Sequence, residues 1–233
     1  MASAAILETL PVIERRTLGD AAYLHLRELL MSGRVAPGER LSLRALAGAL
    51  GVSMMPVREA VTRLVADRAL EVAPNRAVRV PVMNVTQFRE LAAIRIEIEG
   101  FAAELAAKAS APDSIEIISV AEKAFRAEAA RARPDLPRAV ALNKDFHFAL
   151  YDAAGLPALV EIIGGLWLKV GPIINLDLRE NPERLATGGA VRFHAEAASA
   201  IRRRDGAAAR AAIAADISGT AAFLLAKGGL VEA

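Results

Sequence analysis

From Gln87 onward the chain is divided by proline and glycine into segments of helical length, and this pattern constrains the fold most. The segments span residues 87–109, 113–132, 136–154, 157–179, 188–204 and 206–227. Hydrophobic residues make up 54% of the chain but aromatic residues only 4%, so the core is built from Ala, Leu, Val and Ile. Because Ala and Leu favour helices, the sequence predicts an all-helical bundle here.

The first 82 residues show shorter elements. Helical spacing of apolar residues predicts helices over 15–33, 43–50 and 54–69. Two β-prone runs within 70–82 flank Pro74-Asn75-Arg76-Ala77 and predict a hairpin. Three helices and a hairpin, with a glycine-centred turn between the second and third helices, are typical of a winged helix-turn-helix.

The sequence therefore predicts a mainly α protein with two domains. The predicted boundaries are an N-terminal tail over 1–14, a winged helix-turn-helix over 15–82, a linker over 83–86 and a helical bundle over 87–228.

The segment GVSMMPVREAV, residues 51–61, begins the third helix. Gly51 can take the positive φ that a tight turn requires. Ser53 is a natural N-cap, and Pro56 falls in the first turn, where a missing N–H costs little. The helix therefore starts sharply after the turn.

The first turn of this helix is expected to face outward. The core face is already occupied by Val57, Val61 and Leu64, so Met54, Met55 and Arg58 are predicted to lie on the exposed side. In a helix-turn-helix this N-terminal end enters the major groove of DNA.

Charge and composition point to a nucleic-acid partner and an intracellular setting. The net charge is only +2, yet the stretch from Arg40 to Val85 holds seven arginines and three acidic residues. Such a local basic patch favours a polyanion. The absence of cysteine excludes disulfides and thiolate metal sites and fits a cytoplasmic protein. No apolar run reaches about 18 residues and no signal peptide is evident, so no membrane association is expected.

The stretch PGERLSLRALAGALGVSMMPVREAVTRLVADRALEVAPNRAVRV resembles the DNA-binding domain of the GntR family of bacterial transcription regulators. The resemblance implies that Arg44 contacts DNA beside the groove and that Ser53 binds a phosphate. It implies that Arg58 reads a guanine or clamps the backbone, and that Arg76 enters the minor groove from the wing. Met54 stands where the family most often has arginine, which predicts one charged contact fewer.

A second group of residues suggests a metal site in the bundle. Asn143 and His147, within NKDFH, are four residues apart and share one helical face. His194 and Asp216 lie on two later helices, and bundles build metal sites from such nitrogen and oxygen donors. The alternative is that these are ordinary core or surface groups.

The segment from Gln87 to Lys227 is similar to the ligand-binding bundle of the FadR-like branch of this family, called FCD. The similarity lies in RIEIEGFAAELAA, NKDFHFALYDAAGLPAL and HAEAASAIRRRDGAAARAAIAADI. It implies a divalent metal held by Asn143, His147, His194 and Asp216. Asparagine replaces the usual aspartate and Asp216 replaces the usual last histidine, so the formal ligand charge is unchanged. Zinc is the first candidate, with nickel or manganese as alternatives.

The resemblance also implies a small effector, for which a carboxylate is expected. Arg95 matches an arginine that can face the effector pocket and pair with a carboxylate. An equally weighted alternative is a buried ion pair between Arg95 and Glu99, one turn away.

The predicted function is a homodimeric transcription regulator that represses from a palindromic DNA operator and responds to the effector. One alternative is a metal-dependent enzyme using His147, His194 and Asp216, although no nucleophile–base pair stands out near them. Another is a regulator whose bundle binds no metal.

Overall fold

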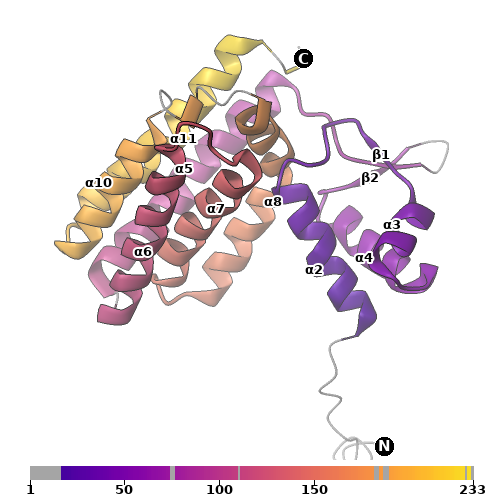
Figure 1. The fold of residues 1–233 in the computed structure, drawn as a ribbon, viewed down its shortest axis with the longest axis horizontal. Coiled ribbons are helices and arrows are strands. Elements are labelled where there is room, and N and C mark those ends of the chain that lie inside the picture. The colour runs from indigo at the N-terminus through magenta and orange to yellow at the C-terminus, as the bar shows by residue number, and fades with distance from the viewer. Residues whose placement is uncertain are drawn as a thin grey trace, which may run out of the picture.

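The N-terminal domain has three helices and a small sheet (Figure 1). The computed structural model describes residues 17–73, 77–109, 111–180, 184–185, 189–228 and 230–231. The elements of this domain are α2 (Leu18–Met31), β1 (Arg40–Leu41), α3 (Leu43–Leu50), α4 (Met54–Ala66), β2 (Glu71–Val72) and β3 (Val78–Arg79). The predicted winged helix-turn-helix architecture is confirmed.

Local signals explain where these elements begin and end. Thr17 and Asp20 form a capping box that starts α2. Gly51 ends α3 with a φ of 65°, as its position in the predicted turn requires. The sheet is antiparallel in the order β1-β3-β2, so the predicted hairpin gains a third strand at Arg40–Leu41 that the sequence did not indicate.

The C-terminal domain is the expected bundle of long helices. It consists of α5 (Val85–Ala109), α6 (Pro112–Ala129), α7 (Leu136–Asp152), α8 (Pro157–Glu180), α10 (Ala190–Arg202) and α11 (Gly206–Lys227). α5 begins two residues before the predicted start. Asn84 and Gln87 exchange hydrogen bonds of 2.8 and 3.0 Å there and cap its first turn.

The bundle is joined to the DNA-binding domain mainly by α8. Figure 1 shows α2 packed beside α8, with α5 and α11 running side by side at the other side of the bundle. Large buried side chains such as Trp167 and Ile163 place α8 in the core. Both domains contribute residues to one continuous hydrophobic cluster.

Within the described part of the chain, two helices are long and apolar enough to cross a membrane by length and composition alone. These are Pro157–Leu178 within α8 and Gly206–Lys227, with mean hydropathies of 1.5 and 1.3. In the fold 56% and 39% of their apolar windows are buried against other helices. Their apolar side chains therefore pack in the bundle.

Candidate functional site

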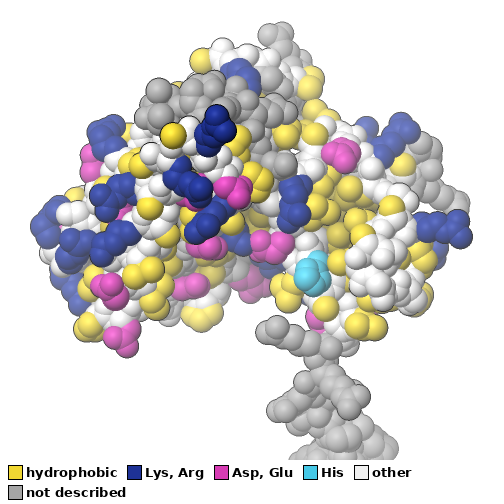
Figure 2. Space-filling view, viewed as in Figure 1, with side chains coloured by type: hydrophobic (Ala, Val, Ile, Leu, Met, Phe, Trp, Pro, Cys, Tyr) yellow, Lys and Arg dark blue, Asp and Glu magenta, His cyan; other side chains and the backbone are white. Residues whose placement is uncertain are grey.

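The first candidate site is the exposed end of the helix-turn-helix. Arg44 on α3 and Arg58 near the start of α4 are both exposed, and Met55 is 72% exposed. Figure 2 shows Lys and Arg side chains projecting from this outer edge of the domain, beside α3 and the sheet. Arg76 lies outside the described residues. This edge of the domain therefore exposes the positively charged side chains of Arg44 on α3 and Arg58 on α4 to solvent.

Two details of this helix differ from the prediction. Met54 is half-buried and packs against the core instead of facing outward. The reason is its spacing, because Met54 lies three residues before Val57 and seven before Val61, on the same helical face. Ser53 occupies the N-cap position, but its side chain makes no capping hydrogen bond. Its exposed hydroxyl therefore keeps its hydrogen-bonding capacity.

The second candidate site is a buried group of three donors from three helices. His147 on α7, His194 on α10 and Asp216 on α11 each offer a ligand atom, and these atoms lie within 4.8 Å of one another. His147 Nε2 is 3.3 Å and His194 Nε2 is 3.8 Å from Asp216 Oδ2. Two donors each about 2.0–2.1 Å from a tetrahedral zinc ion stand roughly 3.3 Å apart. The spacing therefore fits such an ion after small adjustments.

His194 is the clearest sign that this group is built for a ligand. It is fully buried, and neither ring nitrogen has a hydrogen-bond partner within the described part of the chain. A buried polar atom without a partner costs about 1–3 kcal/mol unless something binds it. Burial lowers the pKa of His194, against the raising effect of Asp216, and so favours the neutral ring, which has a lone pair for a metal ion.

Asp216 supplies the negative charge of the group. Burial acts to raise the pKa of this carboxyl, but the neighbouring His147 and His194 rings outweigh it and hold the pKa well below its usual range. The site therefore combines one carboxylate with imidazole donors, the set that zinc accepts.

A chain of hydrogen bonds behind His147 sets the direction in which its ring can bind. Glu99 is fully buried and accepts hydrogen bonds from Trp167 Nε1 at 3.2 Å and from the Tyr151 hydroxyl. Since that hydroxyl donates to Glu99, it accepts from His147 Nδ1, 2.9 Å away. Nδ1 therefore carries a proton, and Nε2 lies 3.3 Å from Asp216 Oδ2, where its lone pair would be free to bind a metal ion.

Arg95 forms the buried ion pair with Glu99. Its Nε and Nη2 lie 2.6 and 3.2 Å from the two carboxylate oxygens, and the side chain is 4% exposed. Arg95 also lines the cavity beside the metal-ligand group. The ion-pair alternative is thus observed, and the contact with an effector remains a prediction.

A cavity of about 40 Å³ is lined by two of the three donors, His147 and Asp216. That space holds only a few water-sized molecules. Its lining includes the predicted Asn143, His147, Arg95 and Asp216 and also the unpredicted Trp167, Asn175, Arg184 and Thr220. Asn175 had one signal in the sequence, since it is a polar residue within an otherwise apolar stretch of α8.

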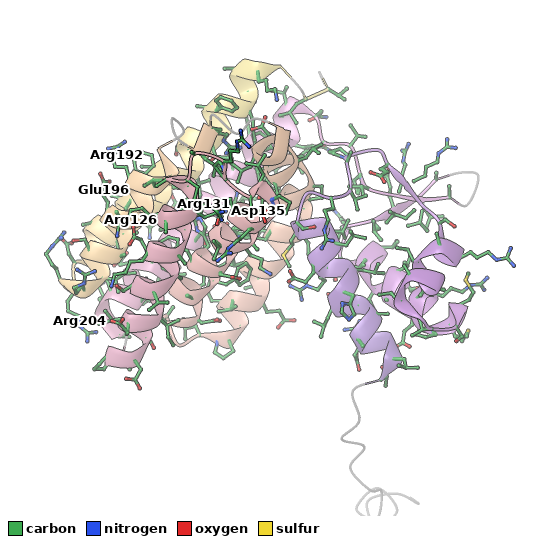
Figure 3. All side chains as sticks on the ribbon, viewed as in Figure 1. Arg126, Arg131, Asp135, Arg192, Glu196 and Arg204 are labelled. Atoms are coloured by element: carbon green, nitrogen blue, oxygen red, sulfur yellow. The ribbon has the colours of Figure 1, made fainter. Side chains whose placement is uncertain are left out.

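The outer face of the bundle carries many charges that do not belong to this site. Figure 3 shows labelled side chains on α6, α10 and their connecting turns projecting into solvent: Arg126, Arg131, Asp135, Arg192, Glu196 and Arg204. Several have neighbours of opposite charge one turn away, such as Arg192 and Glu196 at 3.3 Å. These pairs describe a solvated helix surface.

A winged helix with exposed arginines, joined to a helical bundle that encloses a polar cavity, defines a two-domain DNA-binding transcription regulator. The chain belongs to the GntR family. Residues 18–80 match the model of bacterial regulatory proteins of the gntR family, and residues 90–219 match the FCD domain. This membership places the protein among transcription regulators and not among enzymes.

Individual relatives agree with this assignment. The chain is 38% identical over 148 residues to the HTH-type transcriptional regulator McbR of Escherichia coli K12, an alignment spanning 63% of this chain and 66% of that relative. It is 28% identical over 193 residues to the HTH-type transcriptional repressor RspR of the same organism, spanning 82% of each chain.

Solved structures show the same fold. Escherichia coli McbR/YncC superposes with a TM-score of 0.83 and 29% identity, covering 91% of this chain and 99% of that chain. A putative GntR regulator from Rhodococcus sp. RHA1 superposes with a TM-score of 0.72 at 22% identity, covering 89% and 97%.

Proposed function

We propose that this regulator is a cytoplasmic homodimer that represses transcription from a palindromic operator. In this proposal the helical domain holds a divalent metal, zinc in the first instance, and a small carboxylate binds beside it. Binding of the carboxylate favours one arrangement of the domains over another and so changes the affinity for DNA. Such a response requires the ligand to bind the two arrangements with different affinities.

The observation that carries the metal proposal is the orphaned His194 beside His147 and Asp216. A polar side chain buried without a partner is expensive, and a metal ion at this point would satisfy it together with its two neighbours. The ion would supply a positive charge that attracts a carboxylate. Asn143, which lines the cavity and is half-buried, is the proposed fourth donor.

The effector proposal rests on the small size and polar lining of the cavity. Arg184 lies within reach of the cavity, and its Nη atoms bind Asp177 at 2.8 Å and Thr220 at 2.9 Å. Arg95 is likewise paired with Glu99. Both arginines are held in place by these partners, so they present fixed positive charge to a small organic acid.

Metal content separates this proposal from a metal-free bundle. Protein purified without added metal is analysed for bound metals as wild type and as His147→Ala, His194→Ala and His25→Ala. His25 is the matched control because it is exposed on α2, outside the bundle. We expect close to one equivalent in the wild type and in His25→Ala and a large loss in the other two. Absence of metal from every protein, including after zinc addition, would refute the metal site.

The DNA proposal is tested by selecting double-stranded DNA that binds the protein from a random pool. A palindromic consensus, with two chains bound per site by light scattering, is the expected result. A consensus without two-fold symmetry, bound by one chain, would contradict the dimer and its operator.

A further inference from the structure

Asn175 occupies a position between the cavity and the DNA-binding domain. It lies on α8, is 2% exposed and lines the cavity that also contacts His147 and Asp216. Its side-chain amide donates a hydrogen bond to the backbone carbonyl of Met31, the last residue of α2. One buried residue therefore contacts both the candidate ligand site and the DNA-binding domain.

The packing around this hydrogen bond leaves little free space. Gly33 has a φ of +63°, and a Cβ placed on it would overlap the backbone of Asn175 and Leu176. A Cβ on Gly171 would come within 2.9 Å of the Cα of Met31. Because close-packed interfaces resist gradual deformation, a shift of this part of α8 must move the end of α2 or separate from it.

α8 is able to shift here because Pro172 lies inside it. Proline lacks the backbone N–H that would bond to the carbonyl four residues earlier, which weakens the helix at that point. The turn that carries Asn175 thus follows a position where Pro172 cannot donate a backbone hydrogen bond, while Trp167 lies before it. The missing hydrogen bond makes it easier for the last two turns to move relative to the rest of the helix.

The end of α2 is connected in turn to the recognition helix. Leu26 and Leu30 on α2 and Val57 and Leu64 on α4 are buried in one cluster. A displacement of Met31 at the end of α2 therefore also shifts α4, because the two helices are packed together. A second side-chain link between α2 and the bundle is the ion pair of Glu28 with Lys144 at 2.6 Å, whose partners are 53% and 21% exposed and do not line the cavity.

We propose that Asn175, which lines the cavity but is not one of the proposed metal donors, transmits occupancy of the cavity to the DNA-binding domain through its hydrogen bond to Met31. The proposal rests on the metal site of the proposed function. Zinc and the waters that complete its coordination would fill the cavity of about 40 Å³, which holds only a few water-sized molecules, and would press on the Asn175 turn. The carbonyl of Met31 then loses the hydrogen bond from the Asn175 amide, and the end of α2 opens more often.

Hydrogen–deuterium exchange of the peptide over residues 26–35 tests this transmission, with zinc as the probe. Zinc affinity is measured in parallel by competition with a chelator. In wild type, zinc is expected to speed exchange about twofold to tenfold, the equivalent of one net hydrogen bond. In Asn175→Leu, which keeps the side-chain volume but cannot donate, zinc is expected to bind within threefold of wild type and to leave exchange unchanged.

A matched control and a second variant complete the design. Lys144→Met removes the ion pair with Glu28 without changing the sequence of the measured peptide, and its exchange should change on zinc binding by the same factor as in wild type. Asn175→Ser introduces a smaller polar residue that cannot reach Met31, and its exchange should likewise not change on zinc binding. Because the two variants differ in size and polarity, agreement between them shows that the result does not come from a folding defect in one of them. A zinc response that persists in both Asn175 variants refutes the transmission, as does unchanged or slower exchange in zinc-loaded wild type. Failure of zinc to bind wild type refutes the metal site as well.

Discussion

Replacing Tyr151 with phenylalanine removes a hydroxyl on which the proposed metal site depends, and it leaves every proposed metal ligand in the sequence unchanged. The hydroxyl donates to Glu99 and accepts from His147 Nδ1 at 2.9 Å. Phenylalanine keeps the ring and its packing, while the Nδ1 hydrogen is left without its acceptor. The predicted consequence is that His147 no longer holds its Nε2 lone pair toward Asp216.

The magnitude follows from the burial of the group. His147 is 2% exposed, and an unsatisfied buried donor costs about 1–3 kcal/mol. Because about 1.4 kcal/mol is a factor of ten, zinc affinity should fall roughly 5-fold to 150-fold. This range overlaps the 10- to 100-fold losses typical of residues that orient a metal-binding histidine.

Two measurements check the prediction. Chelator competition gives zinc affinity, and nitrogen-15 NMR of the imidazole rings in metal-free protein gives the tautomer. Wild-type His147 should carry its proton on Nδ1, and in Tyr151→Phe the proton should move to Nε2. Trp167→Phe is the control, since it also removes a hydrogen bond to Glu99 but leaves the His147–Tyr151 contact. An unchanged tautomer, or zinc affinity within threefold of wild type in Tyr151→Phe, would refute the argument.

The remaining predictions concern DNA binding and stability. Arg58→Ala should abolish binding to selected operator DNA with an unchanged circular dichroism spectrum, and retention of wild-type affinity would show that Arg58 does not read DNA. Met55→Arg should strengthen binding and steepen its salt dependence by about one unit, whereas Met54→Arg should lower the melting temperature because Met54 packs against the core. Gly33→Ala should lower the free energy of unfolding in urea by more than about 1 kcal/mol. The reason is that the positive φ of Gly33 and the nearby backbone of Asn175 both oppose a Cβ. A smaller loss would mean that the contact between α2 and α8 at Gly33 can rearrange at little cost.

Much of the fold follows from local signals in the sequence. Gly51 predicted the turn before α4 because few residues other than glycine adopt a positive φ without strain. Prolines and glycines also marked the helices of the bundle to within a few residues. These features depend on the residue and its neighbours, so the sequence alone was sufficient to predict them.

Features that depend on distant parts of the chain were harder to predict. The two-residue strand β1 exists because Arg40 and Leu41 pair with β3, and no local pattern marks so short a strand. The cavity was likewise only partly predicted. Spacing places Asn143 and His147 on one face, but the addition of His194 and Asp216 requires the packing of α10 and α11.

Met54 shows how a local signal can also be misjudged. The helical period that identified Val57 and Val61 as core positions also includes Met54, three residues before Val57. Met54 stands where the family most often has arginine, which suggested a contact with DNA. Its position on the helix instead determined its burial.

The affinity for selected operator DNA, measured with zinc-loaded and metal-free protein, tests the central claim most directly. Coupling between sites in a regulator is typically about 5-fold to 150-fold in affinity. We predict a difference of at least about fivefold between the two forms of the wild type, and no difference in His194→Ala, which lacks one of the three buried metal donors. Equal affinities for both forms of the wild type, with zinc shown to be bound, would contradict a metal-containing cavity that controls DNA binding.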